Sequence, residues 1–278
     1  PTRALAPAVG PRRAPRWRAA MHVPAAIEPA VACLCYALCS TSLSLFNKLA
    51  FSGQSFDFPM AILAFQSACA VVFLKGGDVL GLTQPVPLSR DLLVIIAPVT
   101  LLFCLMLWTS GKALRHCSMP LFTVCKNLAV VGTTAWEYYR FKAEVTRGVA
   151  FSLALMVGGS VVAGSGDLST SAVGIMWMLL NVATTVAYLA VLKERVPADI
   201  PSAAKTFHNN VLTLALFCGA AAATGEGAAF LARLSEQTAV FKAGLVCTGV
   251  LGTLINVCTF WCMRVASGGT YAFVGATN

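Results

Sequence analysis

Two consecutive asparagines, Asn209 and Asn210, lie inside an apolar stretch and follow Phe207 and His208. Adjacent carboxamides offer hydrogen-bond donors and acceptors side by side, which suits recognition of the edge of a nucleobase. Hydrogen bonding between neighbouring helices is the alternative role, worth about 0.6 kcal/mol on average in membrane proteins. His208 by itself is better explained by packing or by proton sensitivity than by metal binding. Residues 207–210 are therefore a candidate site for a base.

Lys126 and Asn127 form a second polar pair, about two turns into an apolar run that begins at Met119. A charged side chain at the centre of a membrane helix costs about 2.5–3.5 kcal/mol. We therefore expect Lys126 to face a hydrated cavity or an anion. The alternative is a structural lysine that donates to carbonyl groups at a helix end. Lys48 is weaker evidence, because it lies near the end of its apolar stretch and can extend to the interface.

The last four residues, Gly275, Ala276, Thr277 and Asn278, combine small and polar side chains. The small residues expose helix backbone, and the hydroxyl and amide groups suit hydrogen bonds to sugar hydroxyls. The same composition also describes an ordinary contact between helices. Residues 122–127 read FTVCKN and residues 273–278 read FVGATN, a faint internal similarity. It is the kind expected of two halves related by inverted repetition around a central site.

Eight apolar stretches must position these groups. Hydrophobic residues make up 58% of the chain and charged residues only 11%, whereas about a quarter of a globular protein is charged. A helix needs roughly 20 apolar residues to cross a bilayer. The sequence therefore predicts an all-α membrane protein with spans at residues 28–51, 58–75, 92–114, 119–136, 146–164, 172–192, 203–224 and 240–263.

The two ends of the chain differ from this pattern. Residues 1–27 are rich in Pro, Ala and Arg, and we expect a disordered basic arm there. Residues 28–278 form the predicted transmembrane domain, in which a ninth stretch opens near residue 267 and is cut off at residue 278. The chain thus looks truncated in its ninth helix, and we expect a protein with this boundary not to transport.

The distribution of Lys and Arg residues between loops indicates how the chain is oriented in the membrane. If the arm is cytoplasmic, most Lys and Arg residues fall in loops on its side of the membrane, which predicts a cytoplasmic N-terminus. The net charge of +9 is then mainly a topological signal, with some affinity for anionic membrane lipids. Nucleic-acid binding is not expected, because no basic stripe interleaves with aromatic residues in a soluble segment.

The sequence does not offer the residue patterns that a metal site or an enzyme would need. Nearly all of the 11 cysteines lie in apolar stretches without CxxC or Cys/His spacing, so we interpret them as small hydrophobic residues and expect no metal site. The 11 acidic residues fall at the ends of spans or in loops. An enzyme would need paired carboxylates, or a nucleophile with a base, at mid-membrane. We therefore expect no enzymatic activity and no cofactor.

The motifs resemble those of a known family. Phe207-His208-Asn209-Asn210 resembles the FYNN motif of the Golgi GDP-mannose transporters, which belong to the drug/metabolite transporter superfamily. Gly275-Ala276-Thr277-Asn278 resembles the first four residues of their GALNK motif, and Lys126-Asn127-Leu128 resembles part of their FKNLT stretch. The resemblance covers residues 31–278. His208 replaces the motif tyrosine, Thr277 its leucine, and Phe122 a family tyrosine, so guanine recognition is better supported than mannose recognition.

The resemblance implies a ten-helix drug/metabolite transporter fold with inverted five-helix repeats, of which about eight and a half helices are present here. It also implies an antiporter in the Golgi membrane that exchanges cytosolic GDP-mannose, or another GDP-sugar, for luminal GMP by alternating access. By resemblance the nucleotide site comprises Phe207, His208, Asn209 and Asn210, and the ribose and sugar site comprises Tyr36, Phe122, Tyr271, Gly275, Ala276, Thr277 and Asn278.

The sequence also bears on the phosphate group of the substrate and on alternative substrates. Our own physical inference adds Lys126, with Asn127, as the group that balances phosphate charge, because Lys126 is the deepest cation in the chain. A carrier of UDP-sugars, or a sugar-phosphate/phosphate antiporter, would share the fold and is the alternative function. The sugar that is carried and the formation of a homodimer are both left open.

Overall fold

The apolar stretches of the sequence are α-helices in a computed structural model of the protein, which describes residues 24, 27–52, 56–81, 87, 89–142, 144–165, 171–197, 200 and 202–265. Within these ranges there is no strand. All eight predicted stretches are confirmed as helices: α2 (Glu28–Ser52), α3 (Pro59–Val79), α4 (Arg90–His116), α5 (Met119–Phe141), α6 (Arg147–Ser165), α7 (Ala172–Arg195), α8 (Ser202–Ala223) and α10 (Ala239–Val265). The predicted ninth stretch lies outside the described residues.

Several helices begin at a serine that caps the first turn. The hydroxyl oxygens of Ser89, Ser118 and Ser171 each accept a hydrogen bond from the backbone N–H three residues later, at 3.1, 3.4 and 3.2 Å. The first N–H groups of a helix have no partner within the helix, so these caps fix where α4, α5 and α7 start.

Not every helix in the described part of the chain is long and apolar enough to cross a membrane by itself. Five helices, namely α2, α3, α4, α7 and α10, are long and apolar enough to cross a membrane. A sixth span is added if α8 and the short helix α9 (Glu226–Glu236), which is bent from it by 90°, count together. The structure thus shows an all-α membrane protein with multiple spans. The ten-helix count and the inverted repeats stay predictions.

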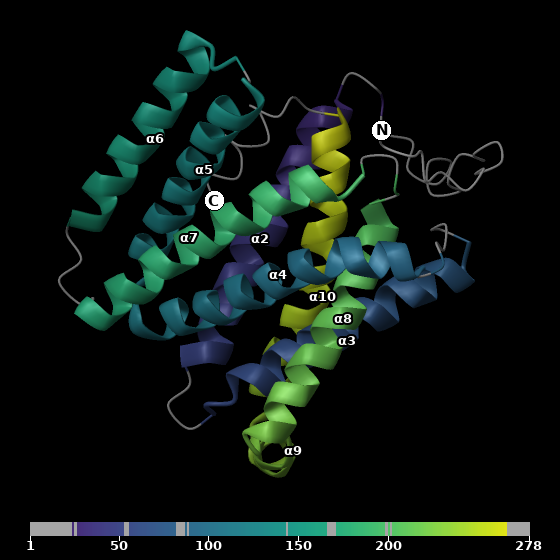
Figure 1. Cartoon of the computed structure of the whole chain (residues 1–278). Helices are drawn as coiled ribbons and strands as arrows, with labels where there is room; N and C mark the ends of the chain where they lie inside the picture. Colours follow the sequence, from purple (N-terminus) through teal and green to yellow (C-terminus); the bar gives the residue numbers. More distant parts are fainter. Residues whose placement is uncertain are drawn as a thin grey trace.

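The helices pack in two groups that meet at α4 (Figure 1). Helix α2 lies along α10, while α3 lies along α8 and α10. On the other side, α7 packs along α4 and α5, and α6 packs on α5. Helix α4 contacts α2 and α8 in one group and α5 and α7 in the other, so it packs between the two groups.

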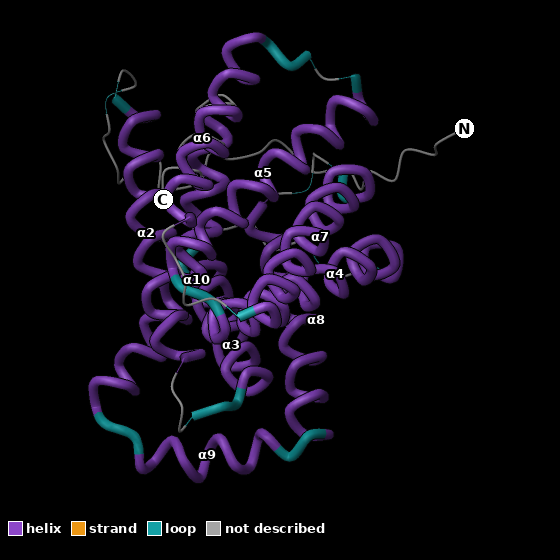
Figure 2. The backbone as a smooth tube through the Cα atoms, turned by 90° about the vertical axis from the view of Figure 1, so that its left-hand side faces the viewer, coloured by secondary structure: helices purple, strands orange, loops and turns teal. Residues whose placement is uncertain are grey.

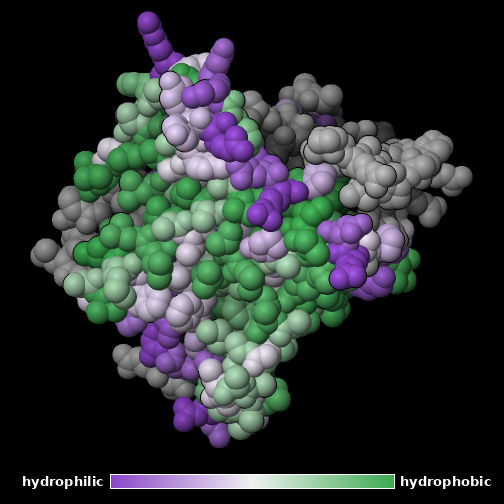
Figure 3. Space-filling model, viewed as in Figure 1, coloured by the Kyte–Doolittle hydropathy of each residue, from purple (hydrophilic) through white to green (hydrophobic). Residues whose placement is uncertain are grey.

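Apolar residues cover much of the face seen in Figure 3. On α2 the exposed leucines recur every turn or two, at Leu34, Leu38, Leu45 and Leu49. An apolar stripe of this kind on a soluble protein would be an unusual feature, whereas on a membrane protein it is the surface that contacts lipid.

Helix α9 was not predicted, and it closes one end of the molecule. It runs across the end between α8 and α10 (Figure 2), after a turn in which Gly225 adopts a φ of 74°. The ring of Phe56, which is 1% exposed, lies 5.3 Å from the ring of Phe230 on α9 and 4.8 Å from that of Phe241 on α10. This aromatic cluster fixes α9 to the start of α3.

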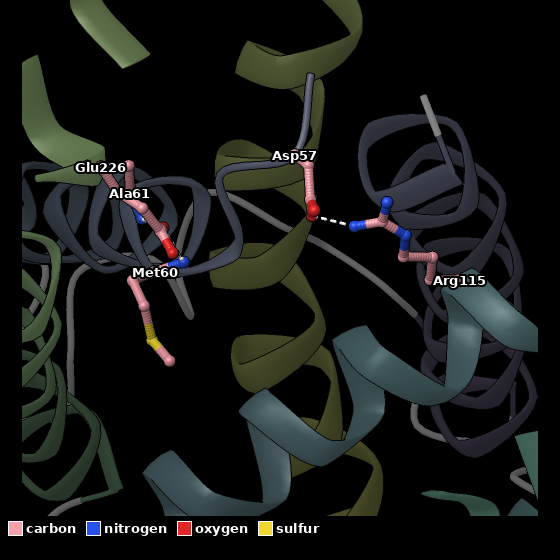
Figure 4. A network of polar contacts seen from close by, with 5 residues as sticks. All are labelled: Asp57, Met60, Ala61, Arg115 and Glu226. Atoms are coloured by element: carbon pink, nitrogen blue, oxygen red, sulfur yellow. Dashed lines mark hydrogen bonds and ion pairs between the residues drawn. The ribbon is translucent and has the colours of Figure 1, made fainter. Parts of the chain in front are cut away.

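Polar contacts at the same end cap α3 and tie it to α4 (Figure 4). Glu226 Oε2 accepts hydrogen bonds from the N–H groups of Met60 at 2.9 Å and Ala61 at 3.4 Å, at the start of α3. Helix α3 needs this outside acceptor because its N-cap residue, Phe58, makes no side-chain capping bond. Arg115 forms an ion pair with Asp57, which joins the end of α4 to the segment before α3.

Candidate functional site

The predicted base-recognition residues lie on the second turn of α8. Helical geometry turns each residue about 100° from the one before it, so neighbours on this turn face different helices. His208 and Asn210 are buried, with 4% and 6% exposure, and Asn209 is half-buried. The ring of Phe207 lies 5.5 Å from the His208 ring, and Lys75 Nζ lies 6.0 Å from the centre of the Phe207 ring.

Asn209 is held by α4. Its Oδ1 accepts a hydrogen bond from the Thr100 hydroxyl at 2.8 Å, and Thr100 is 1% exposed. One of the two lone pairs of the Asn209 amide oxygen is therefore used within the protein. Its Nδ2 group has no hydrogen bond to any described residue.

Asn210 has the opposite arrangement. Its Nδ2 donates to the backbone carbonyl of Thr206 at 2.8 Å, one turn earlier in α8. Within the described part of the chain, no hydrogen bond reaches its Oδ1. The Nδ2 group of Asn209 and the Oδ1 atom of Asn210 are thus without a described partner.

Lys126 on α5 reaches toward α2. Its Nζ lies 3.5 Å from Ser44 Oγ and 5.9 Å from the centre of the Phe122 ring, and the lysine is half-buried. Phe122 and Asn127 are buried beside it. The ion pairs among the described residues involve other cations: Lys75, Arg115, Arg140 and Lys193. Lys126 is therefore a cation without a carboxylate partner in the part of the chain that the structure describes.

The carbonyl-bound lysine that we considered for Lys126 is found at Lys48 instead. Lys48 Nζ donates to the backbone carbonyl oxygens of Leu114 and Cys117, at the end of α4. These carbonyls have no partner within the helix, so the lysine caps it. Among the described residues Lys126 makes no such contact with a backbone carbonyl, and its hydrogen bond goes to Ser44 Oγ.

The remaining predicted residues are divided between the two groups of helices and the undescribed end. Tyr36 is buried on α2, the helix that Lys126 approaches. Tyr271, Gly275, Ala276, Thr277 and Asn278 lie outside the described residues. Their role at a ribose and sugar site stays a prediction.

Helix α4 packs on both helices that carry the predicted sites, α8 and α5. Helix α8 packs on α3 and α4, and α5 packs on α6, α7 and α4. The structure therefore brings Lys126 together with Phe122 and Ser44, and Asn209 together with Thr100. No described hydrogen bond joins the first group to the second, so a single pocket shared by both also stays a prediction.

The sequence did not reveal Thr100 or Ser44. A hydroxyl inside a membrane helix usually donates to the carbonyl one turn earlier, as Thr133 does to Ala129 at 2.8 Å and Thr253 does to Gly249 at 3.0 Å. Nothing in the residue type separates those threonines from Thr100. Only the approach of α8 shows that the Thr100 hydroxyl bonds across helices.

The described residues contain no group of three or more His, Cys, Asp or Glu that could hold a metal ion. The free groups of the site are instead an amide donor, an amide oxygen and an ammonium group. Such groups recognise polar, anionic organic molecules by hydrogen bonds and charge.

Comparisons with known proteins give one consistent result. The chain is 31% identical over 274 residues to a protein of Pyricularia oryzae named GDP-mannose transporter, covering 90% of this chain and 69% of that protein. It is 28% identical to the protein of the same name from Yarrowia lipolytica, over 90% of this chain and 82% of that protein. For the Aspergillus fumigatus protein of that name the identity is 29%, over 99% of this chain and 75% of the relative. No family model matches the chain.

Proposed function

We propose that this chain, which belongs to the GDP-mannose transporter family and is a nucleotide-sugar transporter, exchanges a GDP-sugar for GMP. The sugar nucleotide enters from the cytosol, and GMP returns from the lumen. GDP-mannose is the first candidate, because the relatives carry it in their names. The membrane is that of the Golgi apparatus, and the N-terminus lies in the cytosol.

One observation carries most of the proposal. Asn209 and Asn210 are consecutive carboxamides within a helix of a membrane transporter, and each keeps one polar group free of the described protein. Free polar groups in a membrane interior are costly unless a ligand or water satisfies them. A base that hydrogen-bonds to both amides meets this need, with Phe207 and His208 beside it.

Lys126 supports the same function from the opposite side. A sugar nucleotide carries a pyrophosphate, which needs a cation in any cavity that excludes bulk water. Lys126 supplies a cation that has no carboxylate partner among the described residues. In this role Asn127 and Phe122 hold the lysine, and Tyr36 adds an aromatic wall. Tyr271, Gly275, Ala276, Thr277 and Asn278 line the ribose and sugar.

Exchange follows if only the ligand-bound carrier crosses readily between its two states. A ligand shifts a conformational equilibrium by as much as its affinities for the two states differ. The sugar nucleotide and GMP share the guanine base, so both make the contacts at α8 that stabilise the intermediate. Each transported sugar nucleotide then requires one nucleoside monophosphate on the return step.

Uptake by the full-length protein in proteoliposomes tests the proposal. We expect radiolabelled GDP-mannose to enter vesicles that contain GMP, and external GMP to compete while UMP does not. The variants Asn209→Ala and Asn210→Ala should lose at least about tenfold in uptake, because each removes a buried hydrogen bond to the base. They should fold normally, as shown by monodisperse elution in detergent.

The same experiment separates the alternative function. A carrier of UDP-sugars, or an antiporter of sugar phosphates, would have the same helices and the same apolar surface. Inhibition of uptake by UMP but not by GMP would identify the first. Competition by inorganic phosphate without any effect of the base would identify the second.

A further inference from the structure

We infer that Ser44 on α2 is a phosphate-binding residue, which acts together with Lys126 on α5 so that the phosphate of the nucleotide joins the two helices. The inference rests on the proposed function, in which Lys126 balances the phosphate charge. It adds a hydrogen-bonding group from α2, the helix that otherwise contributes only Tyr36 to the proposed site.

The contact between Lys126 and Ser44 leaves several hydrogen-bond donors in one place. Lys126 Nζ lies 3.5 Å from Ser44 Oγ, and an ammonium group has no acceptor, so the serine oxygen accepts. The hydroxyl proton of Ser44 and the two other N–H groups of the ammonium are not used by this contact. Neither side chain has another hydrogen-bond partner among the described residues. Donors combined with a positive charge suit an anion that carries only acceptor oxygens, as a phosphate does.

Ser44 differs from other serines inside the described helices. The hydroxyls of Ser67 and Ser235 donate to backbone carbonyls of their own helices, at 2.9 Å to Leu63 and at 2.7 Å to Ala232. Such a bond within the helix is the usual way for a serine to satisfy its proton. The described contact of Ser44 crosses from α2 to α5 instead. Its proton is therefore available to a ligand.

The helices that carry Ser44 and Lys126 belong to different groups. Helix α2 packs along α10 and on α4, whereas α5 packs on α6 and α7. The long lysine side chain makes the contact between them, and its flexible stem allows the ammonium to withdraw from the serine so that a phosphate fits between. Both residues are half-buried, so neither is sealed from a ligand.

A phosphate that both side chains contact joins the two groups of helices. Such a ligand stabilises the state in which the groups lie close together, because its affinity is higher there. Guanosine has the base but no phosphate, so it can occupy the amides of α8 without joining α2 to α5. GMP should therefore support exchange, and guanosine should not.

The first test measures the affinities of the purified full-length protein for radiolabelled GMP and for radiolabelled guanosine. Ser44→Ala removes the hydroxyl. Ser42→Ala is the matched control, because Ser42 is also half-buried on α2 and lies about 200° further around the helix. Ser44→Ala is also measured in the Lys126→Met background, and the melting temperature of each variant is recorded in parallel.

We expect Ser44→Ala to weaken the binding of GMP by about tenfold, as for a hydrogen bond to a charged group, and to leave guanosine unaffected. In the Lys126→Met background a further loss of about threefold should remain, because Ser44 contacts the phosphate itself. Ser42→Ala should bind both ligands as the wild-type protein does.

Three results would overturn the inference. The first is unchanged GMP binding in Ser44→Ala, and the second is an equal loss for guanosine. The third is no further loss in the Lys126→Met background, which would mean that Ser44 only positions the lysine.

The wild-type protein alone provides a second test that does not depend on folding of a variant. Proteoliposomes are loaded with GMP or with guanosine, and we expect uptake of GDP-mannose only in those that contain GMP. If guanosine supports uptake as well as GMP does, while UMP does not, the phosphate contact is wrong and the proposed recognition of guanine stands. If GMP does not bind at all, the proposed function itself fails, and this inference fails with it.

Discussion

The ammonium group of Lys48 on α2 donates a hydrogen bond to the backbone carbonyl of Leu114 in the last turn of α4. The same group also donates to Cys117, the residue that follows α4. The end of α4 is thus closed by a charge that comes from a helix more than sixty residues earlier in the chain. Since Lys126 makes no such contact with a described residue, Lys48 and Lys126 should differ in function.

Replacing Lys48 with Met should destabilise the protein. The change removes both capping bonds and leaves carbonyls of Leu114 and Cys117 unpaired, at a cost of about 1–3 kcal/mol. We expect a lower melting temperature in detergent and an unchanged affinity for GMP. Lys242→Met is a matched control, because Lys242 also donates to a carbonyl, that of Ser235 at 2.9 Å, but does so at the exposed surface. Equal melting temperatures for the two variants would show that the α4 cap is not structural.

Replacing Lys126 with Met should have the reverse effect. The change removes a charge without a described carboxylate partner, so we expect the melting temperature without ligand to stay the same or to rise. The affinity for GDP-mannose should fall by about 10- to 100-fold, the worth of a hydrogen bond to a charged group.

Guanosine provides the control for Lys126. It has the base but no phosphate, so its weaker binding should be the same in Lys126→Met and in the wild-type protein. Equal losses for guanosine and GDP-mannose would mean that Lys126 holds the fold of the site and not the phosphate.

Glu226 should stabilise the start of α3. Glu226→Ala removes the acceptor for the N–H groups of Met60 and Ala61, and the loss of a helix N-cap typically costs about 0.5–2 kcal/mol. We expect a lower melting temperature than for Glu236→Ala, an exposed glutamate at the end of the same short helix. If both variants melt together, the cap contributes nothing.

Close packing between α3 and α10 depends on Gly249. A Cβ atom at this position would lie 2.6 Å from Cys69 Sγ and 2.7 Å from Cys69 Cβ, and a Cβ carbon cannot move away without moving its helix. Gly249→Ala should therefore cost about 1–3 kcal/mol of stability. Gly252→Ala, three residues later on α10, meets nothing within 4 Å and should be close to neutral. Comparable melting temperatures for the two variants would show that α3 and α10 can move apart at no cost.

The positions of the helices could be predicted from the sequence because burial in lipid demands long apolar runs, and all eight predicted runs are helices. Helix α9 could not, because its 11 residues are too few to span a membrane and include charged residues at both ends. Its position depends on Phe230, which packs on Phe56 from a distant part of the chain. Contacts of this kind are not visible in local composition.

The candidate site, like the fold, could be predicted only in part. Lys126 and Asn209 stand out in the sequence because polar groups in apolar runs are costly. Their partners, Ser44 and Thr100, do not stand out, since a hydroxyl in a helix can be satisfied by its own backbone. Sequence thus identifies the costly groups, and only the packing of α2 and α4 identifies what holds them.

Exchange driven by a guanine nucleotide is the central claim, and the most direct measurement is uptake of GDP-mannose into proteoliposomes loaded with GMP, with UMP or with neither. We expect fast uptake only in the vesicles that contain GMP, because the return step needs a ligand that occupies the amides of α8. Equal uptake in empty vesicles, or faster uptake with UMP than with GMP, would contradict the account.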